Sequence, residues 1–112
     1  MKSFFDAAVL EKIGGKLSVL KNIRIPELKN GQVLVKIKYT AICGSQMQEI
    51  YGGRDNNKYL PHLLGHEATG IIENVHHNIK NLKKGDRVFL SWISKKAKFH
   101  TSYTHPKKKK LK

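Results

Sequence analysis

The fold of this chain is decided in residues 43–67, which read CGSQMQEIYGGRDNNKYLPHLLGHE. This stretch holds the only cysteine of the chain, Cys43, and a hydroxyl two positions later, Ser45. It ends with a histidine and a carboxylate directly after a glycine, His66 and Glu67. Thiolate, imidazole and carboxylate are the ligands that protein zinc sites use. A metal centre is therefore one hypothesis for this stretch.

Each of these residues also has an ordinary structural explanation. A lone cysteine is more often a small buried apolar residue than a ligand. A lone histidine is more often a hydrogen-bonded structural residue, and Glu67 by itself is typical of a surface charge. Gly65 favours a functional explanation, because glycine lets the backbone approach a site closely. Residue types alone thus leave both explanations of Cys43 and His66 open.

The residues before Cys43 are typical of short strands. Apolar runs at 4–10 and 17–23, separated by a glycine pair, predict a β-hairpin. Asn30-Gly31 is the dipeptide that most favours a tight hairpin turn, and we expect a hairpin there. Residues 32–41 then alternate with period two, which predicts a half-buried antiparallel strand. Its inner face would carry Val33, Val35, Ile37, Tyr39 and Ala41.

One short helix is predicted after Cys43. Ser45 and Gln48 have the spacing of a capping box, and Gly52-Gly53 ends the helix two turns later. The residues expected to pack inward are Met47 and Ile50, and those expected on the helix surface are Gln46 and Glu49. Ser45 therefore has a second explanation as a helix cap, and this role is compatible with a catalytic one.

Two more strands are predicted after Glu67, at 68–75 and 87–92, with a turn at 83–86 before the second. The chain thus consists mostly of short strands with one short helix. This pattern predicts a mainly β fold, a small barrel or sandwich.

Composition limits the class of protein. A chain of 112 residues forms at most one domain. No apolar run approaches the ~20 residues of a membrane span, and the N-terminus lacks the pattern of a signal peptide. One cysteine allows no intrachain disulfide. We therefore expect a cytoplasmic protein with no membrane partner.

The net charge of +14 is unevenly distributed. Residues 93–112 hold eight lysines and no acid, with four of them consecutive at 107–110. Such a run can bind nucleic acid. A solvated strand or a frayed end is the commoner explanation, because aromatic residues do not alternate with the lysines as in a stacking surface. Nucleic-acid binding is kept as an alternative function.

Several motifs together resemble a known family. They are Gly31-Gln32-Val33-Leu34-Val35-Lys36, Ile42-Cys43-Gly44-Ser45, Gly52-Gly53, Leu64-Gly65-His66-Glu67-Ala68-Thr69-Gly70 and Lys84-Gly85-Asp86-Arg87-Val88. In this order they resemble the GroES-like N-terminal domain of zinc-dependent alcohol dehydrogenases, in the medium-chain dehydrogenase/reductase superfamily. The resemblance implies a GroES-like barrel in residues 1–92, followed by a basic segment at 93–112.

The resemblance also implies a role for each site residue. Cys43 resembles the first ligand of the catalytic zinc and His66 the second. Glu67 resembles the acid beside the metal, which in this family forms a nearby hydrogen bond or enters the zinc shell. Ser45 resembles the hydroxyl that carries the substrate's proton away. The implied reaction moves a hydride between an alcohol or aldehyde and a nicotinamide.

This chain departs from the family pattern in the residue after Ser45. Many relatives have an acid there, placed to hold the ligand histidine, whereas this chain has Gln46. A glutamine oxygen accepts a hydrogen bond from an imidazole without adding charge, so we expect weaker zinc binding than with an acid.

The larger departure is in what the sequence lacks. No G-x-G-x-x-G motif follows a strand, so NAD or NADP would bind only through a domain absent from this chain. With one cysteine, there is no four-cysteine structural lobe and no third thiolate ligand, so the zinc site is incomplete. We therefore expect a truncated portion of the enzyme, inactive by itself; a homo-oligomer of the complete enzyme is compatible with the family. A stand-alone GroES-like binding module is the other alternative.

Overall fold

The computed structural model describes residues 3–52, 60–91, 103–105 and 108–111. These residues form mainly strands, together with one helix, which confirms the predicted fold class. They belong to two compact units. Unit 1 comprises 1–26, 43–64 and 101–112, and unit 2 comprises 27–42 and 65–100. Within the described part of the chain, no helix combines the length and apolar character needed to cross a membrane.

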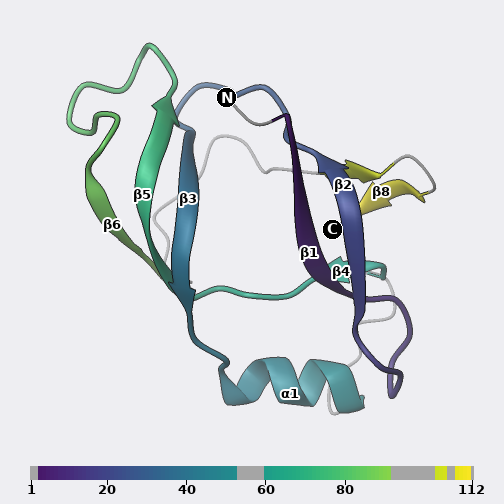
Figure 1. Ribbon diagram of the computed structural model, residues 1–112. Coiled ribbons are helices and arrows are strands. Elements are labelled where there is room, and N and C mark those ends of the chain that lie inside the picture. Colours follow the sequence, from purple (N-terminus) through teal and green to yellow (C-terminus); the bar gives the residue numbers. More distant parts are fainter. Residues whose placement is uncertain (1–2, 53–59, 92–102, 106–107, 112) are drawn as a thin grey trace. The chain divides into compact units, whose positions relative to one another are not determined.

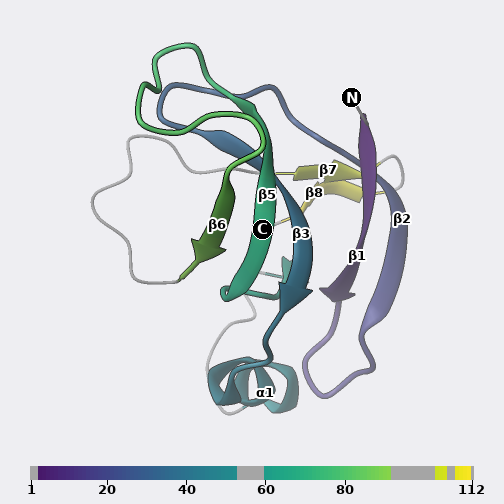
Figure 2. The same ribbon diagram turned by 60° about the vertical axis from the view of Figure 1, so that its left-hand side comes forward.

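Unit 1 contains the helix and a five-stranded sheet. In order across the sheet, the strands are β4 (His62–Leu63), β1 (Phe4–Leu10), β2 (Ser18–Arg24), β7 (Tyr103–His105) and β8 (Lys108–Leu111). β1 and β2 pair antiparallel, which confirms the first predicted hairpin (Figure 1). β7 and β8 form a second antiparallel pair, visible in Figure 2. Part of the lysine run is therefore in a strand.

The core of unit 1 lies on one face of the β1–β2 hairpin. Val9 and Ile23 are fully buried. The partly buried residues packed against them are Phe5, Ala7, Leu20, Leu63 and Tyr103. The rings of Phe5 and Tyr103 meet edge to face, with centroids 5.3 Å apart. Burial raises the pKa of Tyr103 above its ordinary 10.0, because the phenolate would lose hydration.

Unit 2 contains a three-stranded antiparallel sheet. β5 (Ala68–Val75) lies between β3 (Val33–Thr40) and β6 (Arg87–Leu90), as Figure 1 shows. β5 has the bounds that the sequence predicts, and β6 ends at Leu90; Trp92, the predicted end, lies outside the described residues. Gly70 is buried in the central strand, where a Cβ would lie 2.5 Å from the carbonyl oxygen of Lys36. Only glycine lets β5 approach β3 this closely.

The predicted turn at 83–86 is also present. Asp86 accepts hydrogen bonds from the Lys83 ammonium at 2.7 Å and from the Lys83 backbone N–H at 3.0 Å. These bonds, the side-chain one foremost, lower the pKa of Asp86 because they favour the ionised carboxylate. The turn leads into β6.

Two sequence predictions about β3 are wrong. Gly31 takes a positive φ of 82°, as a turn requires, but no hairpin forms there because β2 and β3 belong to different sheets. The inner face is also shorter than predicted, since Ile37 and Tyr39 are 49% and 78% exposed. A register shift between these two residues interrupts the alternation of side chains. Partial burial on β3 is confined to Val33–Val35, and no residue of the strand is fully buried.

Candidate functional site

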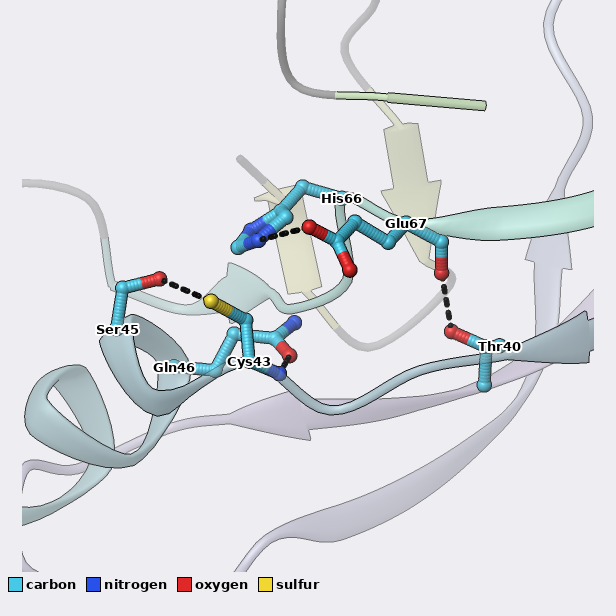
Figure 3. Close-up of polar contacts among 6 residues, drawn as sticks. All are labelled: Thr40, Cys43, Ser45, Gln46, His66 and Glu67. Atoms are coloured by element: carbon cyan, nitrogen blue, oxygen red, sulfur yellow. Dashed lines mark hydrogen bonds and ion pairs between the residues drawn. The ribbon is translucent and has the colours of Figure 1, made fainter. Parts of the chain in front are cut away.

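Cys43 lies at the start of the helix of unit 1, α1 (Gly44–Tyr51). Its backbone is extended, with φ −92° and ψ 150°, and its carbonyl oxygen accepts the N–H of Gln46 at 3.0 Å. The side-chain oxygen of Gln46 accepts the N–H of Cys43 at 2.9 Å (Figure 3). The predicted cap, Ser45 with Gln48, is therefore wrong by two residues. Gly52, with φ 83°, ends the helix as predicted.

The buried and exposed residues of α1 also differ from the prediction. Gln46 is only 6% exposed, whereas Met47 is 40% exposed. Glu49 is partly buried too, instead of lying on the surface. A polar side chain is buried cheaply when its hydrogen bonds are made, and the cap bond to Cys43 provides one for Gln46. Apolar character alone could not identify this bond.

Ser45 lies in the first turn of α1, beside the cysteine. Its hydroxyl donates a hydrogen bond to the sulfur of Cys43 at 3.4 Å, and both side chains are partly buried (Figure 3). The sequence predicted both residues for one site, and the helix turn brings their functional atoms together. A hydroxyl in this position can exchange a proton with a group held next to the sulfur.

His66 and Glu67 lie in unit 2, directly before β5. Gly65 precedes them with φ 121°, a backbone conformation that disfavours other residues. The carbonyl oxygen of Glu67 accepts two hydrogen bonds, from the Thr40 hydroxyl at 2.9 Å (Figure 3) and from the Ala41 N–H at 3.1 Å. The role of Thr40 as an anchor for this segment was not expected from the sequence. No sequence signal indicated it, because the pairing that places Thr40 opposite Ala68 is set by the fold.

The side chains of His66 and Glu67 remain available to a ligand. Nε2 of His66 lies 3.9 Å from Oε1 of Glu67, beyond hydrogen-bonding distance. This Nε2 atom is closed off from solvent and has no hydrogen-bond partner among the described residues. A buried ring nitrogen without a partner is costly, and a metal ion would satisfy it. The geometry of this histidine therefore fits a ligand.

The donor types fit zinc. A cysteine sulfur, an imidazole nitrogen and a carboxylate are ligands of zinc in proteins, whereas magnesium and calcium prefer oxygen alone. Cys43 comes from unit 1, and His66 and Glu67 come from unit 2, so each unit supplies part of the predicted donor set.

Comparisons with known proteins agree with these motifs. The family model described as "Alcohol dehydrogenase GroES-like domain" matches residues 29–110. An alcohol dehydrogenase of Geobacillus stearothermophilus is 37% identical over 87 residues, which are 78% of this chain and 26% of that protein. A D-xylulose reductase of Saccharomyces cerevisiae is 42% identical over 88 residues, 76% of this chain and 24% of that protein. The chain thus spans about a quarter of the length of these relatives.

Solved structures give the same result. A zinc-dependent alcohol dehydrogenase of Streptococcus pneumoniae, in its apo form, has a TM-score of 0.68 and 32% identity over 80% of this chain and 25% of its own. A protein described as a short chain alcohol dehydrogenase of E. coli CFT073, in complex with NADH, has a TM-score of 0.67 and 31% identity over 79% of this chain and 24% of its own. The chain therefore belongs to the family of the alcohol dehydrogenase GroES-like domain.

Proposed function

We propose that this chain supplies catalytic zinc ligands to an NAD(P)-linked alcohol dehydrogenase. The observation that carries the proposal is the buried, unpartnered Nε2 of His66. In the sequence this histidine belongs to the same motif set as Cys43, and one of the similar proteins is a zinc-dependent alcohol dehydrogenase. Cys43 and His66 are the proposed ligands, and Glu67 is a third ligand or an acid beside the metal.

Chain connectivity supports the pairing of these residues. The N–H of Ala41 donates to the carbonyl oxygen of Glu67, and Cys43 follows Ala41 by two residues. Two residues span at most about 7 Å between Cα atoms. The backbone bond at Glu67 therefore ties the His66-Glu67 segment to the part of the chain that leads directly to Cys43.

Each proposed ligand has a feature suited to its role. The sulfur of Cys43 accepts a hydrogen bond from Ser45, which stabilises negative charge on a thiolate. The neutral imidazole of His66 can direct Nε2 at a metal without breaking a hydrogen bond to any described residue. The hydrogen bonds that hold Glu67 in the fold go to its backbone carbonyl oxygen, so they do not occupy its carboxylate.

Ser45 is the proposed proton carrier. A bound zinc ion would polarise the oxygen of an alcohol or aldehyde while hydride moves to or from a nicotinamide. The hydroxyl of Ser45, 3.4 Å from the sulfur of Cys43, would accept the proton of an alcohol held there and pass it on. One similar structure contains NADH, and we propose that a nicotinamide cofactor is bound by a part of the enzyme outside these 112 residues.

Titration of the metal-free, intact protein with Co²⁺ tests the proposal. Cobalt replaces zinc in such sites and shows a near-ultraviolet absorption when a thiolate binds it. We expect this absorption in the wild type, its loss in Cys43→Ser, and binding at least ~10-fold weaker in His66→Ala. His77→Ala is the matched control, because it removes an exposed histidine of the same unit and should bind Co²⁺ like the wild type. The same absorption in Cys43→Ser as in the wild type would refute the proposal.

A further inference from the structure

A second pair of titratable side chains lies in unit 1, outside the predicted donor set. Nδ1 of His62 is 3.0 Å from Oε2 of Glu49. The side chains are 25% and 19% exposed, and both of these atoms are closed off from solvent. The two groups form an ion pair when the imidazole is protonated. Neither residue belongs to the motifs that suggest a function in the sequence.

The pair joins two elements that lead to proposed ligands. Glu49 lies in α1, the helix that begins directly after Cys43 and carries Ser45. His62 lies in β4, four residues before His66. Four residues span at most about 14 Å, so the place of His62 limits where His66 can be.

Attachment of the helix to its unit does not depend on this pair. The N–H of Gly14 donates to the carbonyl oxygen of Ile50 at 2.7 Å, which already ties α1 to the turn between β1 and β2. β4 is attached to the sheet separately, through its pairing with Val9 and Leu10. The pair adds a direct contact between α1 and β4. The two atoms in contact, Oε2 of Glu49 and Nδ1 of His62, are not accessible to solvent.

We propose that Glu49 and His62 form a positioning pair for the zinc site. The pair fixes the strand that leads to His66 against the helix that begins at Cys43. This inference rests on the proposed function. Groups that hydrogen-bond to the ligands of a metal typically change its affinity by about 10–100-fold. The pair acts on the ligands only through the chain, so we expect an effect at the lower end of this range, about 10-fold.

The test measures Co²⁺ affinity and the visible absorption bands of bound cobalt, which report its coordination geometry. The variants are Glu49→Ala, His62→Ala, the double variant and His62→Asn, all in the intact protein. We expect about 10-fold weaker binding and altered bands in each alanine variant, with the double variant no weaker than either single one. His62→Asn should restore binding towards wild type, because its amide N–H₂ can face the Glu49 carboxylate from the position of Nδ1.

Control variants separate positioning from a general loss of charge. Glu27→Ala and His77→Ala remove an exposed acid and an exposed histidine, and both should bind Co²⁺ like the wild type. Circular dichroism of the metal-free proteins checks that each variant is folded. Glu49→Met, which keeps the length of the side chain without an oxygen to face His62, replaces Glu49→Ala if the latter does not fold.

The outcomes distinguish the two proposals. Wild-type affinity and bands in both alanine variants, with binding that still depends on Cys43, would overturn the positioning role and leave the proposed function intact. Weakened binding in the alanine variants without recovery in His62→Asn would also overturn it, because the contact between the two side chains would then not be the cause. A wild type that shows no Cys43-dependent cobalt absorption would overturn the proposed function and this inference with it.

Discussion

The close approach of β5 to β3 at Gly70 gives a prediction about stability. Gly70 lies in β5, opposite Ile37 of β3 and Val88 of β6. In Gly70→Ala, the new Cβ would lie 2.5 Å from the carbonyl oxygen of Lys36 and 2.6 Å from Cγ1 of Val35. Unstrained contacts of this kind are about 3.5 Å or longer, so atoms on β3 must move by about 1 Å.

The cost of this movement can be estimated. Overpacking that shifts backbone typically costs about 1–3 kcal/mol, and the upper end applies because a strand carbonyl cannot rotate away as a side chain can. Replacing glycine by alanine also restricts the unfolded chain, which contributes about 0.4–1 kcal/mol in the other direction. We therefore expect Gly70→Ala to lower the free energy of unfolding by about 2 kcal/mol.

Urea denaturation followed by circular dichroism measures this change. With a slope of about 1–3 kcal/mol per molar urea, the midpoint should fall by roughly 1 M. Gly44→Ala is the matched control, because no atom lies within 4 Å of its added Cβ and it occupies a helical position. Its stability should be unchanged or higher by up to about 1 kcal/mol. Equal midpoints for Gly70→Ala and the wild type would refute the reasoning, and equal losses in both variants would remove the contact as the cause.

Two further predictions concern unit 1. Gln46→Ala removes the oxygen that accepts the N–H of Cys43, and we expect urea denaturation to show a loss of about 1 kcal/mol; an unchanged midpoint would mean that the cap bond contributes nothing. Burial raises the pKa of Tyr103, so the stability that its neutral form contributes is fully present below pH 10.0 and is lost as the pH rises further. Tyr103→Phe should keep the ring contact with Phe5 and lose less stability than the wild type between pH 9 and pH 11, whereas parallel pH profiles would contradict the prediction.

Local patterns were enough to predict most of the strands. The run that became β5 was predicted with its observed bounds, and the hairpin of β1 and β2 follows from two apolar runs around a turn. The turn at Asn30-Gly31 shows where such patterns fail. A turn dipeptide fixes the local backbone, but whether the flanking strands pair depends on partners elsewhere, and β3 pairs with β5 instead.

The residue types of the site could be predicted from the sequence, but the hydrogen bonds that hold these residues in place could not. The functional groups of the site can be recognised in the sequence, because thiols, hydroxyls, imidazoles and carboxylates bind metals or transfer protons. They belong to Cys43, Ser45, His66 and Glu67. The bonds that support the site are made by groups whose role has no signal in the sequence, such as the hydroxyl of Thr40 and the backbone of Ala41. The contact of Glu49 with His62 joins residues thirteen positions apart, with no periodicity to indicate it. The expectation that Gln46 weakens zinc binding stays a prediction, although its oxygen is engaged by the N–H of Cys43.

At Glu67, the constraint that the fold places on the amino acid differs from the constraint that the chemistry of the site places on it. Both hydrogen bonds that hold this point go to its carbonyl oxygen, a group that every amino acid carries. Substitution of the side chain should therefore leave the anchor in place, and the fold imposes little choice of residue there. Any constraint on which amino acids natural variants accept at position 67 would then come from the chemistry of the carboxylate.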